Sequence, residues 1–468
     1  MIRRQRHSSI GTVALGVLVG AGALFAGLSA YSHDAGAQTL EEALVQAYQN
    51  NPTLQAERAR LRAVDEEVPA ALAGWQPTVE IAGDLGASYS KTEGTVPNAG
   101  SHSVVPHGVG LTATAPLYQG GRVSAQIDSA ESRVNAGRAQ LQAVEQSILL
   151  STVNAYMDVL RYDAEIELSR SSERVVGRQL QAARDRLEVG EVTRTDVAQA
   201  EARLAQAGAE RVAAEGGMMS ARAMYQQVTG RPPGTLSWPP VPMGLPETEE
   251  DALSSANDAN PSIRAASFIA QAAQADIETA AAALRPQVSI VGDVRQRFDT
   301  SDLIEQTTDA SIRASVRVPL YQGGAASARI RQSKQIAAQR LLELDQSRRT
   351  VQEQVAQAWR ALTSARAQIA AFESQVAAAA VALDGVEQET QVGLRTTLDV
   401  LDAEQEHFRA QINLIRTKRE EIVAAYQVKA SIGALTAQQL GLPVDLYDPE
   451  EHYRSVRDSS GGWLWSDE

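Results

Sequence analysis

The chain has 468 residues, a formal net charge of -14 at pH 7 and 44% hydrophobic residues, among them only 5 Phe and 5 Trp. So few large aromatic side chains, together with abundant alanine, favour helices packed closely along their length over a bulky globular core. The acidic charge argues against nucleic acid as a partner. Because the chain has no cysteine, disulfides, thiolate metal sites and a lipid anchor on cysteine are excluded.

The N-terminus has the pattern of a secretory leader. A basic cluster at residues 3–6 precedes an apolar run at 10–30 and small residues at 35–37. This pattern predicts a signal peptide at 1–37, cleaved before Gln38, and an uncleaved membrane anchor is the alternative. Beyond Gln38 we expect no stretch apolar enough to cross a membrane as a helix, so membrane insertion would use strands.

The chain contains a tandem duplication. Asn51-Pro52 recurs as Asn260-Pro261, and the hexapeptide Pro-Leu-Tyr-Gln-Gly-Gly occurs at both 116–121 and 319–324. The predicted organisation after the signal peptide is a first repeat at 38–232, a linker at 233–250, a second repeat at 251–433 and a C-terminal tail at 434–468.

Each repeat has room for very long helices, because no proline interrupts residues 117–231 or 320–442. We expect long helices at about 121–189 and 324–391, each ending at Val-Gly and followed by a second helix at about 195–229 or 397–432. With the one exception of Ser169, apolar residues recur every seven positions through both long helices, which indicates coiled-coil packing. These positions are Ile127, Val134, Leu141, Ile148, Ala155, Tyr162, Val176 and Ala183, then Ile330, Ala337, Leu344, Val351, Ala358, Ala365, Phe372, Ala379 and Val386.

Before each long helix the hydrophobic period changes to two, which predicts strands at about 77–90, 104–118, 286–298 and 310–321, with Val316 near the centre of the last. A soluble sheet with one wet face is the alternative. The export signal, the strand lengths and the open edges favour a membrane sheet closed by oligomerisation. Three chains with four strands each would supply a single barrel of even strand number.

The duplication, the two Pro-Leu-Tyr-Gln-Gly-Gly junctions and the run from Val392 to Ala403 together resemble the TolC family of outer-membrane factors, over nearly all of Thr39 to Gly433. The resemblance implies a mainly α fold with membrane β structure. In it, duplicated long-helix coiled-coil hairpins form a trimeric α-barrel tunnel joined to a 12-stranded outer-membrane β-barrel. Short helices near 52–73 and 261–283 would stack end to end with the helices that follow the Val-Gly tips.

The resemblance also implies a function, that of a passive outer-membrane exit duct extending into the periplasm. Its implied partners are two further copies of the chain, outer-membrane lipid, a periplasmic adaptor (membrane fusion protein) and an inner-membrane transporter, either ABC-type or proton-driven. The cargo stays open between secreted proteins and small drugs, with a slight preference for type I protein secretion.

By resemblance, Asp196, Thr390 and Arg395 match positions of the periplasmic gate, and Asp399 and Asp402 match acidic rings of the tunnel. Thr390 stands where the family usually carries tyrosine, and a threonine hydroxyl reaches less far than a phenol. Helix capping is the alternative for two of these carboxylates, because Asp196 and Asp399 each follow a threonine by three residues. Asp402 lies one helical turn after Asp399, where like charges repel, so a functional role is favoured.

The tips of the two hairpins match adaptor-docking positions of the family. They comprise Val189, Gly190, Val392, Gly393 and Leu394. Glu191 replaces the leucine usual after the first Val-Gly pair, which weakens the match at that tip. Helix termination is the alternative role for both glycines.

No nucleophile, phosphate-loop or metal-ligand motif occurs, so the sequence predicts neither an enzyme nor any metal or cofactor. A trimeric coiled-coil structural protein or adhesin-like envelope protein is the alternative from a different class. It would leave the duplicated strand hairpins and their apolar face without a role.

Overall fold

The computed structural model describes residues 37–95, 100–301 and 304–458. The predicted signal peptide, apart from Ala37, and the last ten residues of the predicted tail lie outside the described residues. The helices are α1 (Leu40–Asn50), α2 (Pro52–Asp65), α3 (Glu67–Leu72), α4 (Arg122–Glu188), α5 (Arg194–Thr229), α6 (Glu249–Ala259), α7 (Pro261–Ala281), α8 (Ala325–Gln391), α9 (Thr397–Ser431) and α10 (Glu451–Val456), with short 3-10 turns at Ala73–Trp75 and Ala282–Leu284.

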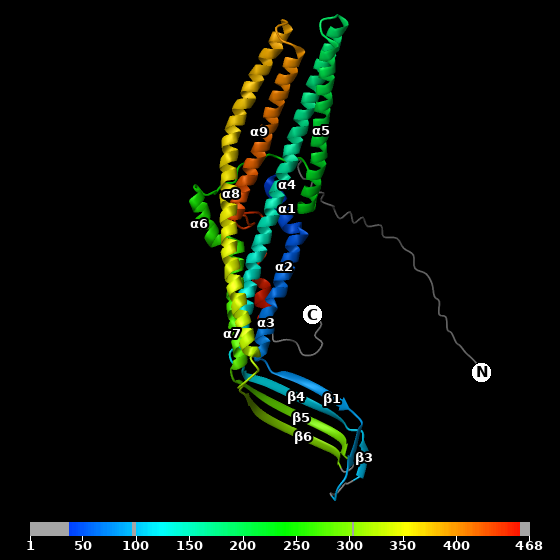
Figure 1. Ribbon diagram of the computed structural model, residues 1–468, viewed down its shortest axis with the longest axis vertical. Coiled ribbons are helices and arrows are strands. Elements are labelled where there is room, and N and C mark those ends of the chain that lie inside the picture. The colour runs from blue at the N-terminus through cyan, green and yellow to red at the C-terminus, as the bar shows by residue number, and fades with distance from the viewer. Residues whose placement is uncertain (1–36, 96–99, 302–303, 459–468) are drawn as a thin grey trace, which may run out of the picture. The chain divides into compact units, whose positions relative to one another are not determined.

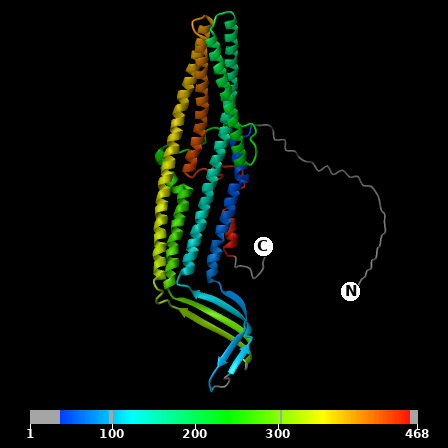
Figure 2. The ribbon, with the colours of Figure 1, turned by 45° about the vertical axis from the view of Figure 1, so that its right-hand side comes forward.

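Two long helical hairpins dominate the part of the chain from Ala37 onward. Helix α4 turns back into α5 and α8 turns back into α9, and Figures 1 and 2 show the two hairpins side by side. Helices α4 and α8 are longer than their partners and continue toward the sheet, where they pack with α2, α3 and α7. The bounds of α4, α5, α8 and α9 differ from the predicted ranges by no more than one residue.

Two asparagines join the short helices to the ends of the hairpins. Asn51 caps α2 by accepting hydrogen bonds from the backbone N–H groups of Thr53 and Leu54, at 2.9 and 3.4 Å. Its Nδ2 donates to the carbonyl of Val228 near the end of α5, at 3.0 Å. Asn260 repeats the arrangement before α7, where its Nδ2 donates to the carbonyl of Ser431 at 2.8 Å. Thus α2 follows α5 and α7 follows α9 end to end, as the family resemblance implied.

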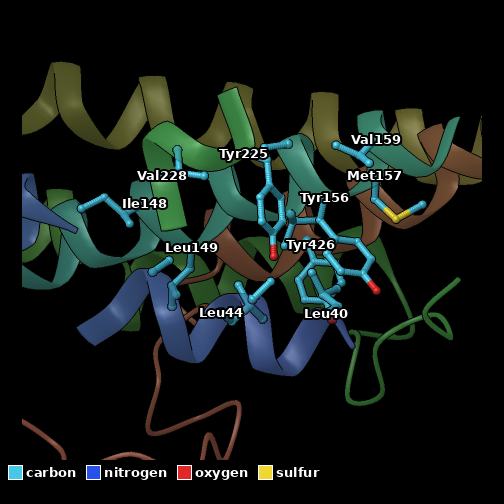
Figure 3. Packing of buried hydrophobic residues seen from close by; sticks show 14 of the residues in the cluster. Leu40, Leu44, Ile148, Leu149, Tyr156, Met157, Val159, Tyr225, Val228 and Tyr426 are labelled. Atoms are coloured by element: carbon cyan, nitrogen blue, oxygen red, sulfur yellow. The ribbon is translucent and has the colours of Figure 1, made fainter. Parts of the chain in front are cut away.

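The main core lies where α1, α4, α5 and α9 meet (Figure 3). Tyr156 and Tyr225 are fully buried there, with ring centres 6.5 Å apart. The Tyr156 hydroxyl lies 2.8 Å from the carbonyl of Gln38 and 2.7 Å from that of Ser237. This one side chain therefore connects Gln38, the long helix α4 and the linker between the repeats.

The heptad positions face the interior as predicted, because none of them is exposed and most are buried. Among the described residues, α8 is also long and apolar enough to cross a membrane by length and composition alone, with an 18-residue window of mean hydropathy 1.4. By that measure the expectation of no such stretch beyond Gln38 was wrong. The reason is that alanines such as Ala377, Ala378 and Ala380 count as apolar although each buries little surface.

The described strands are β1 (Thr78–Leu85), β2 (Ser88–Thr92), β3 (Gly100–Val104), β4 (His107–Tyr118), β5 (Gln287–Ser301) and β6 (Ile304–Arg317). Four of them form one antiparallel sheet in the order β1-β4-β5-β6, and β2 pairs with β3 in a separate ribbon (Figure 2). Hairpins from the two repeats thus lie in one sheet, and in a single chain β1 and β6 are its open edges.

The register places the predicted apolar residues on one face of this sheet. Ile81, Leu111, Val294 and Ala310 form one cross-strand row, and Val79, Ala113, Gly292 and Ile312 form another. The opposite face carries the row Glu80, Thr112, Asp293 and Ser311, in which Asp293 accepts hydrogen bonds from Ser311 and from Arg313 at 2.8 and 2.9 Å. The predicted separation of apolar and polar faces is therefore confirmed. The apolar face is open in the single chain, since Ile81 and Ile312 are 77% and 84% exposed.

The strand bounds differ from the predictions in both repeats. The first predicted hairpin, at 77–90 and 104–118, is split in two, because Pro106 has no N–H for the ladder and its carbonyl instead accepts from Gly86 at 2.9 Å. In the second repeat β5 runs to Ser301 and β6 begins at Ile304. Val316 is consequently the second-to-last residue of β6 and, contrary to the prediction, does not lie near the centre of the strand.

Candidate gate and docking tips

The Val-Gly pairs end the two long helices. Gly190 and Gly393 have φ angles of 82° and 80°, a left-handed conformation that glycine adopts without steric cost. The N–H groups of Gly190 and Glu191 bond to carbonyls of the last turn of α4, at 3.1 and 2.9 Å, and the second tip repeats both bonds. Helix termination is therefore established as one role of both glycines.

The apolar side chains around these glycines project into solvent. Val189 is 72% exposed, Val392 71% and Leu394 76%. Within the described part of the chain, no heavy atom other than those of the adjacent residues lies within 4 Å of the position that a Cβ would take on either glycine. Each tip therefore offers a small apolar surface with open space around it.

Asp196 and Asp399 both cap the helices that begin after the tips. The Asp196 carboxylate accepts from the backbone N–H and the hydroxyl of Thr193 at 2.8 and 2.9 Å, and its own N–H donates to the threonine oxygen at 3.3 Å. Asp399 and Thr396 form the same capping box, with distances of 2.8, 2.8 and 3.3 Å. The hydrogen bond from the Thr396 backbone lowers the pKa of Asp399 below its ordinary value of 3.8, so this carboxylate stays charged at neutral pH.

The other two predicted gate residues form contacts within their own hairpin. Arg395 donates through Nε to Glu389 at 2.9 Å, and this bond raises the pKa of the guanidinium. The Thr390 hydroxyl donates to the carbonyl of Val386, one turn earlier in α8, at 2.7 Å. Within a single chain, therefore, neither side chain connects α8 to the first hairpin.

Near the tips the two hairpins are instead connected through Asp402 on α9, which accepts from Nη2 of Arg203 on α5 at 2.6 Å. Close to it, Val176 and Leu180 of α4, Ala200 of α5 and Leu401 of α9 form a small buried cluster. Asp196, Arg203, Asp399 and Asp402 thus lie on adjoining turns of the two returning helices. The first hairpin has a further ion pair, Arg184 with Glu201 at 2.7 Å, which joins α4 to α5.

Sequence reasoning missed Arg203 and Glu389, the residues that pair with two of the predicted site residues. Arg203 follows Asp196 by two helical turns and so lies on the same face of α5, a spacing that could have been searched for an opposite charge. Glu389 and Arg395 flank the second Val-Gly tip on either side, and their pairing depends on the geometry of the turn. Among the described residues, no group of three His, Cys, Asp or Glu is placed to hold a metal ion.

Comparison with known proteins identifies the family. Residues 43–231 and 252–434 match the family model described as outer membrane efflux protein. The chain belongs to this family. Its members are channels rather than enzymes, and they reside in the outer membrane, which confirms the predicted location and the general function of an outer-membrane export duct.

The relatives and solved structures agree with that assignment. The chain is 38% identical to the outer membrane efflux protein BepC of Brucella suis, covering 94% of this chain and 95% of the relative. It is 26% identical to the outer membrane protein TolC of Vibrio cholerae (89% and 95% covered) and 26% identical to the proteases secretion protein PrtF of Dickeya chrysanthemi (88% and 92% covered). The crystal structure of VceC from Vibrio cholerae superposes with a TM-score of 0.72 at 20% identity, covering 84% of this chain and 96% of that one. The predicted fold class and the TolC-type resemblance are thereby confirmed.

Proposed function

We propose that three copies of the chain close into one passive duct through the outer membrane, gated at the ends of the helical hairpins. The observation that carries the proposal is the four-stranded sheet, which is predominantly apolar on one face and has two open edges, β1 and β6. In lipid every backbone N–H and C=O needs a partner, so open edges are excluded from the hydrocarbon region. Pairing β6 of one chain with β1 of the next removes both edges, and three chains supply twelve strands.

The helices support the same assembly. The apolar stretch of α8 around Val381 is mostly uncovered in the single chain, since Ala377, Ala378 and Ala380 are exposed and Ala379 is buried. Val381 in this part of α8 is 75% exposed, and the neighbouring small alanines leave room for a second helix to approach closely. A neighbouring copy of the chain would cover this surface. A coiled-coil structural protein or adhesin would use such helix contacts but would leave the apolar sheet face uncovered.

We expect the detergent-purified protein to be a trimer, because edge closure needs all three sheets. Multi-angle light scattering, with the detergent contribution subtracted, measures the protein mass directly. A stable monomer or dimer that keeps its strand content would contradict the proposed architecture.

The gate is proposed to consist of the returning helices α5 and α9 near the tips. The Arg203–Asp402 ion pair joins these helices within each chain, so it breaks when one hairpin moves away from the other. Arg395 is paired with Glu389 in its own hairpin, so its proposed gate role requires a second partner on a neighbouring chain. The Thr390 hydroxyl donates a hydrogen bond within α8, and it extends less far from the helix than a tyrosine hydroxyl would.

The acidic rings are proposed to be formed by Asp399 and Asp402, three copies of each around the threefold axis. Replacing both by asparagine should raise the concentration of a multivalent cation needed for half-maximal block by about tenfold or more, because six negative charges disappear from one constriction. Asparagine keeps an oxygen that can accept the capping hydrogen bond of Asp399, so trimer formation should be unchanged. Planar-bilayer recordings with cation added from the periplasmic side make the measurement.

The pH dependence of this block tests the contribution of Asp399. Folding lowers the pKa of Asp399. The carboxylate is therefore fully charged at any pH above the ordinary aspartate pKa, and it loses its charge only when the pH falls through the lowered pKa. Block should therefore persist in mildly acidic solution. If the double asparagine variant is blocked as strongly as the wild type, the acidic-ring assignment is wrong.

The exposed tips around Gly190 and Gly393 are proposed to dock a periplasmic adaptor that connects the duct to an inner-membrane transporter. The chain itself is proposed to have no catalytic activity and no cofactor, so the transporter supplies the energy. Relatives include both an efflux protein and a proteases secretion protein, so the family permits either cargo. A photocrosslinker at Leu394, used in living cells, captures the neighbouring adaptor and its transporter. An ABC-type transporter in the captured complex favours type I protein secretion, and a proton-driven pump favours drug efflux.

A further inference from the structure

A cavity of about 140 Å³ lies between α1, α2, α4 and the segment at 436–449 that follows α9. The C-terminal segment continues into α10, which packs against α2 (Figure 1). Space of this size accommodates several waters or one small polar ligand. Two arginines, Arg58 of α2 and Arg138 of α4, contribute to its wall.

Arg58 is the central residue of the cavity. It projects from the buried face of α2 and is only 9% exposed, and its guanidinium lies 4.6 Å from the ring centre of Tyr48 and 5.0 Å from that of Tyr447. Both tyrosine rings thus make cation–π contacts with this guanidinium. Nε and Nη2 of Arg58 are buried and have no hydrogen-bond partner among the described residues. A buried cation with unpaired donors is costly, which points to a partner that carries negative charge.

Arg138 of α4 adds further donors. Its Nη1 donates to Glu450 at 3.2 Å, and its guanidinium lies 5.0 Å from the ring centre of Tyr453. The other two nitrogens, Nε and Nη2, are buried and unpartnered within the described part of the chain. Four guanidinium nitrogens of these two cavity-lining arginines, Nε and Nη2 of each, therefore have no acceptor among the described residues.

The nearby acidic side chains do not accept hydrogen bonds from Nε or Nη2 of either arginine. Glu145, in the cavity wall, accepts from the backbone N–H of Ala437 at 2.6 Å and makes no hydrogen bond to Arg58. Burial raises the pKa of Glu145 above its ordinary value of 4.5. Asp65, beyond the cavity wall, pairs with His452 at 3.2 Å through Oδ2, and its Oδ1 has no partner.

We propose that this cavity binds a small oxyanion, a carboxylate or a phosphate, through the free guanidinium N–H groups of Arg58 and Arg138. Planar or tetrahedral oxyanions accept two parallel hydrogen bonds from one guanidinium, which neutral waters cannot match in strength. The bound anion would also connect α2 and α4 to the C-terminal segment, since Tyr447 stacks on Arg58 and its backbone N–H donates to the Tyr48 hydroxyl at 3.1 Å. Occupancy would therefore hold that segment against the helices.

Isothermal titration calorimetry of the full-length protein in detergent tests the site, with inorganic phosphate and acetate titrated separately at constant ionic strength. We expect saturable binding of at least one of them, with a dissociation constant in the micromolar to millimolar range that so small a ligand allows. Arg58→Gln should weaken binding about tenfold or more. Arg62→Gln, on the exposed side of the same helix, is the matched control and should bind as the wild type does.

Glu145→Gln provides a test in the opposite direction. It keeps an oxygen for the Ala437 N–H but removes the competing charge, so it should tighten binding by about tenfold. A purely structural role of these residues would give no gain in affinity, and this variant keeps the test decisive if Arg58→Gln fails to fold. The proposal is overturned if neither phosphate nor acetate binds the wild type at up to about 10 mM, in which case water fills the cavity. It is equally overturned if Arg58→Gln binds as well as the wild type, or if Glu145→Gln leaves the affinity unchanged.

Discussion

Ile312→Arg is expected to destabilise the membrane-inserted protein by about 2–4 kcal/mol per chain, the cost of an arginine on the lipid face near the bilayer midplane. Ile312 is 84% exposed on the apolar face of β6 and lies in the cross-strand row of Gly292, Ala113 and Val79. Because each trimer would carry three such charges, the loss should appear as poor recovery of folded protein in outer-membrane fractions. Heat-modified mobility on gels, compared with the wild type, gives the folded fraction.

Ser311→Arg is the matched control, because it introduces the same side chain one residue earlier on the opposite face. There it would lie beside Asp293, a carboxylate that already accepts from Ser311 and Arg313. Insertion of this variant should be close to that of the wild type. Equal recovery of the two variants would mean that the lipid face has been assigned incorrectly or that the sheet does not contact lipid.

Arg203→Gln is expected to shift the duct toward its open state, because it removes the ion pair between α5 and α9. The arginine and Asp402 are partly exposed, so each pair is worth about 0.2–1 kcal/mol. Three pairs in a trimer together contribute about 0.6–3 kcal/mol, which corresponds to a change of about threefold to a hundredfold in the ratio of open to closed states. Single-channel recordings should show a larger mean conductance or more frequent openings.

Arg184→Gln is the control for this gate prediction. Its ion pair with Glu201 joins α4 to α5 inside the first hairpin, so its loss should leave the contact between the two hairpins unchanged. Arg395→Gln tests whether the closed state depends on contacts between neighbouring chains. In the described part of a single chain, Arg395 is paired only with Glu389 of its own hairpin, so a gating effect of this variant would require a partner on another chain. If Arg395→Gln opens the duct and Arg203→Gln does not, the closed state depends on contacts between neighbouring chains, and the α5–α9 ion pair has no gating role.

Much of the fold was predictable because its determinants are local. The absence of proline, the seven-residue apolar repeat and the Val-Gly breaks define α4 and α8, since helix bounds depend on residues within a few turns. The alternation of apolar residues fixed the two faces of the sheet, because a strand places successive side chains on opposite sides. Duplication of the Asn-Pro pair likewise anticipated two equivalent helix junctions, at Asn51 and Asn260.

Other features depended on residues distant in sequence. The strand ends were misplaced because pairing across the sheet, and the missing N–H of Pro106 opposite Gly86, decide where a ladder stops. The capping boxes of Asp196 and Asp399 were visible as local Thr-x-x-Asp patterns. By contrast, the partner of Asp402 was not visible, since Arg203 is on a helix of the other repeat.

The sequence by itself determined the helical hairpins, the amphipathic strands, the duplication and the family, because periodicity and turn chemistry act over short stretches of chain. Tertiary structure alone decided which charges meet. It paired Arg203 with Asp402, and it placed Arg58 beside a cavity and in contact with two tyrosine rings, with two of its nitrogens unpaired among the described residues. The physical reason is that a charge interaction depends on separation in space and on burial, and both are set only when helices from the two repeats and the C-terminal segment pack together.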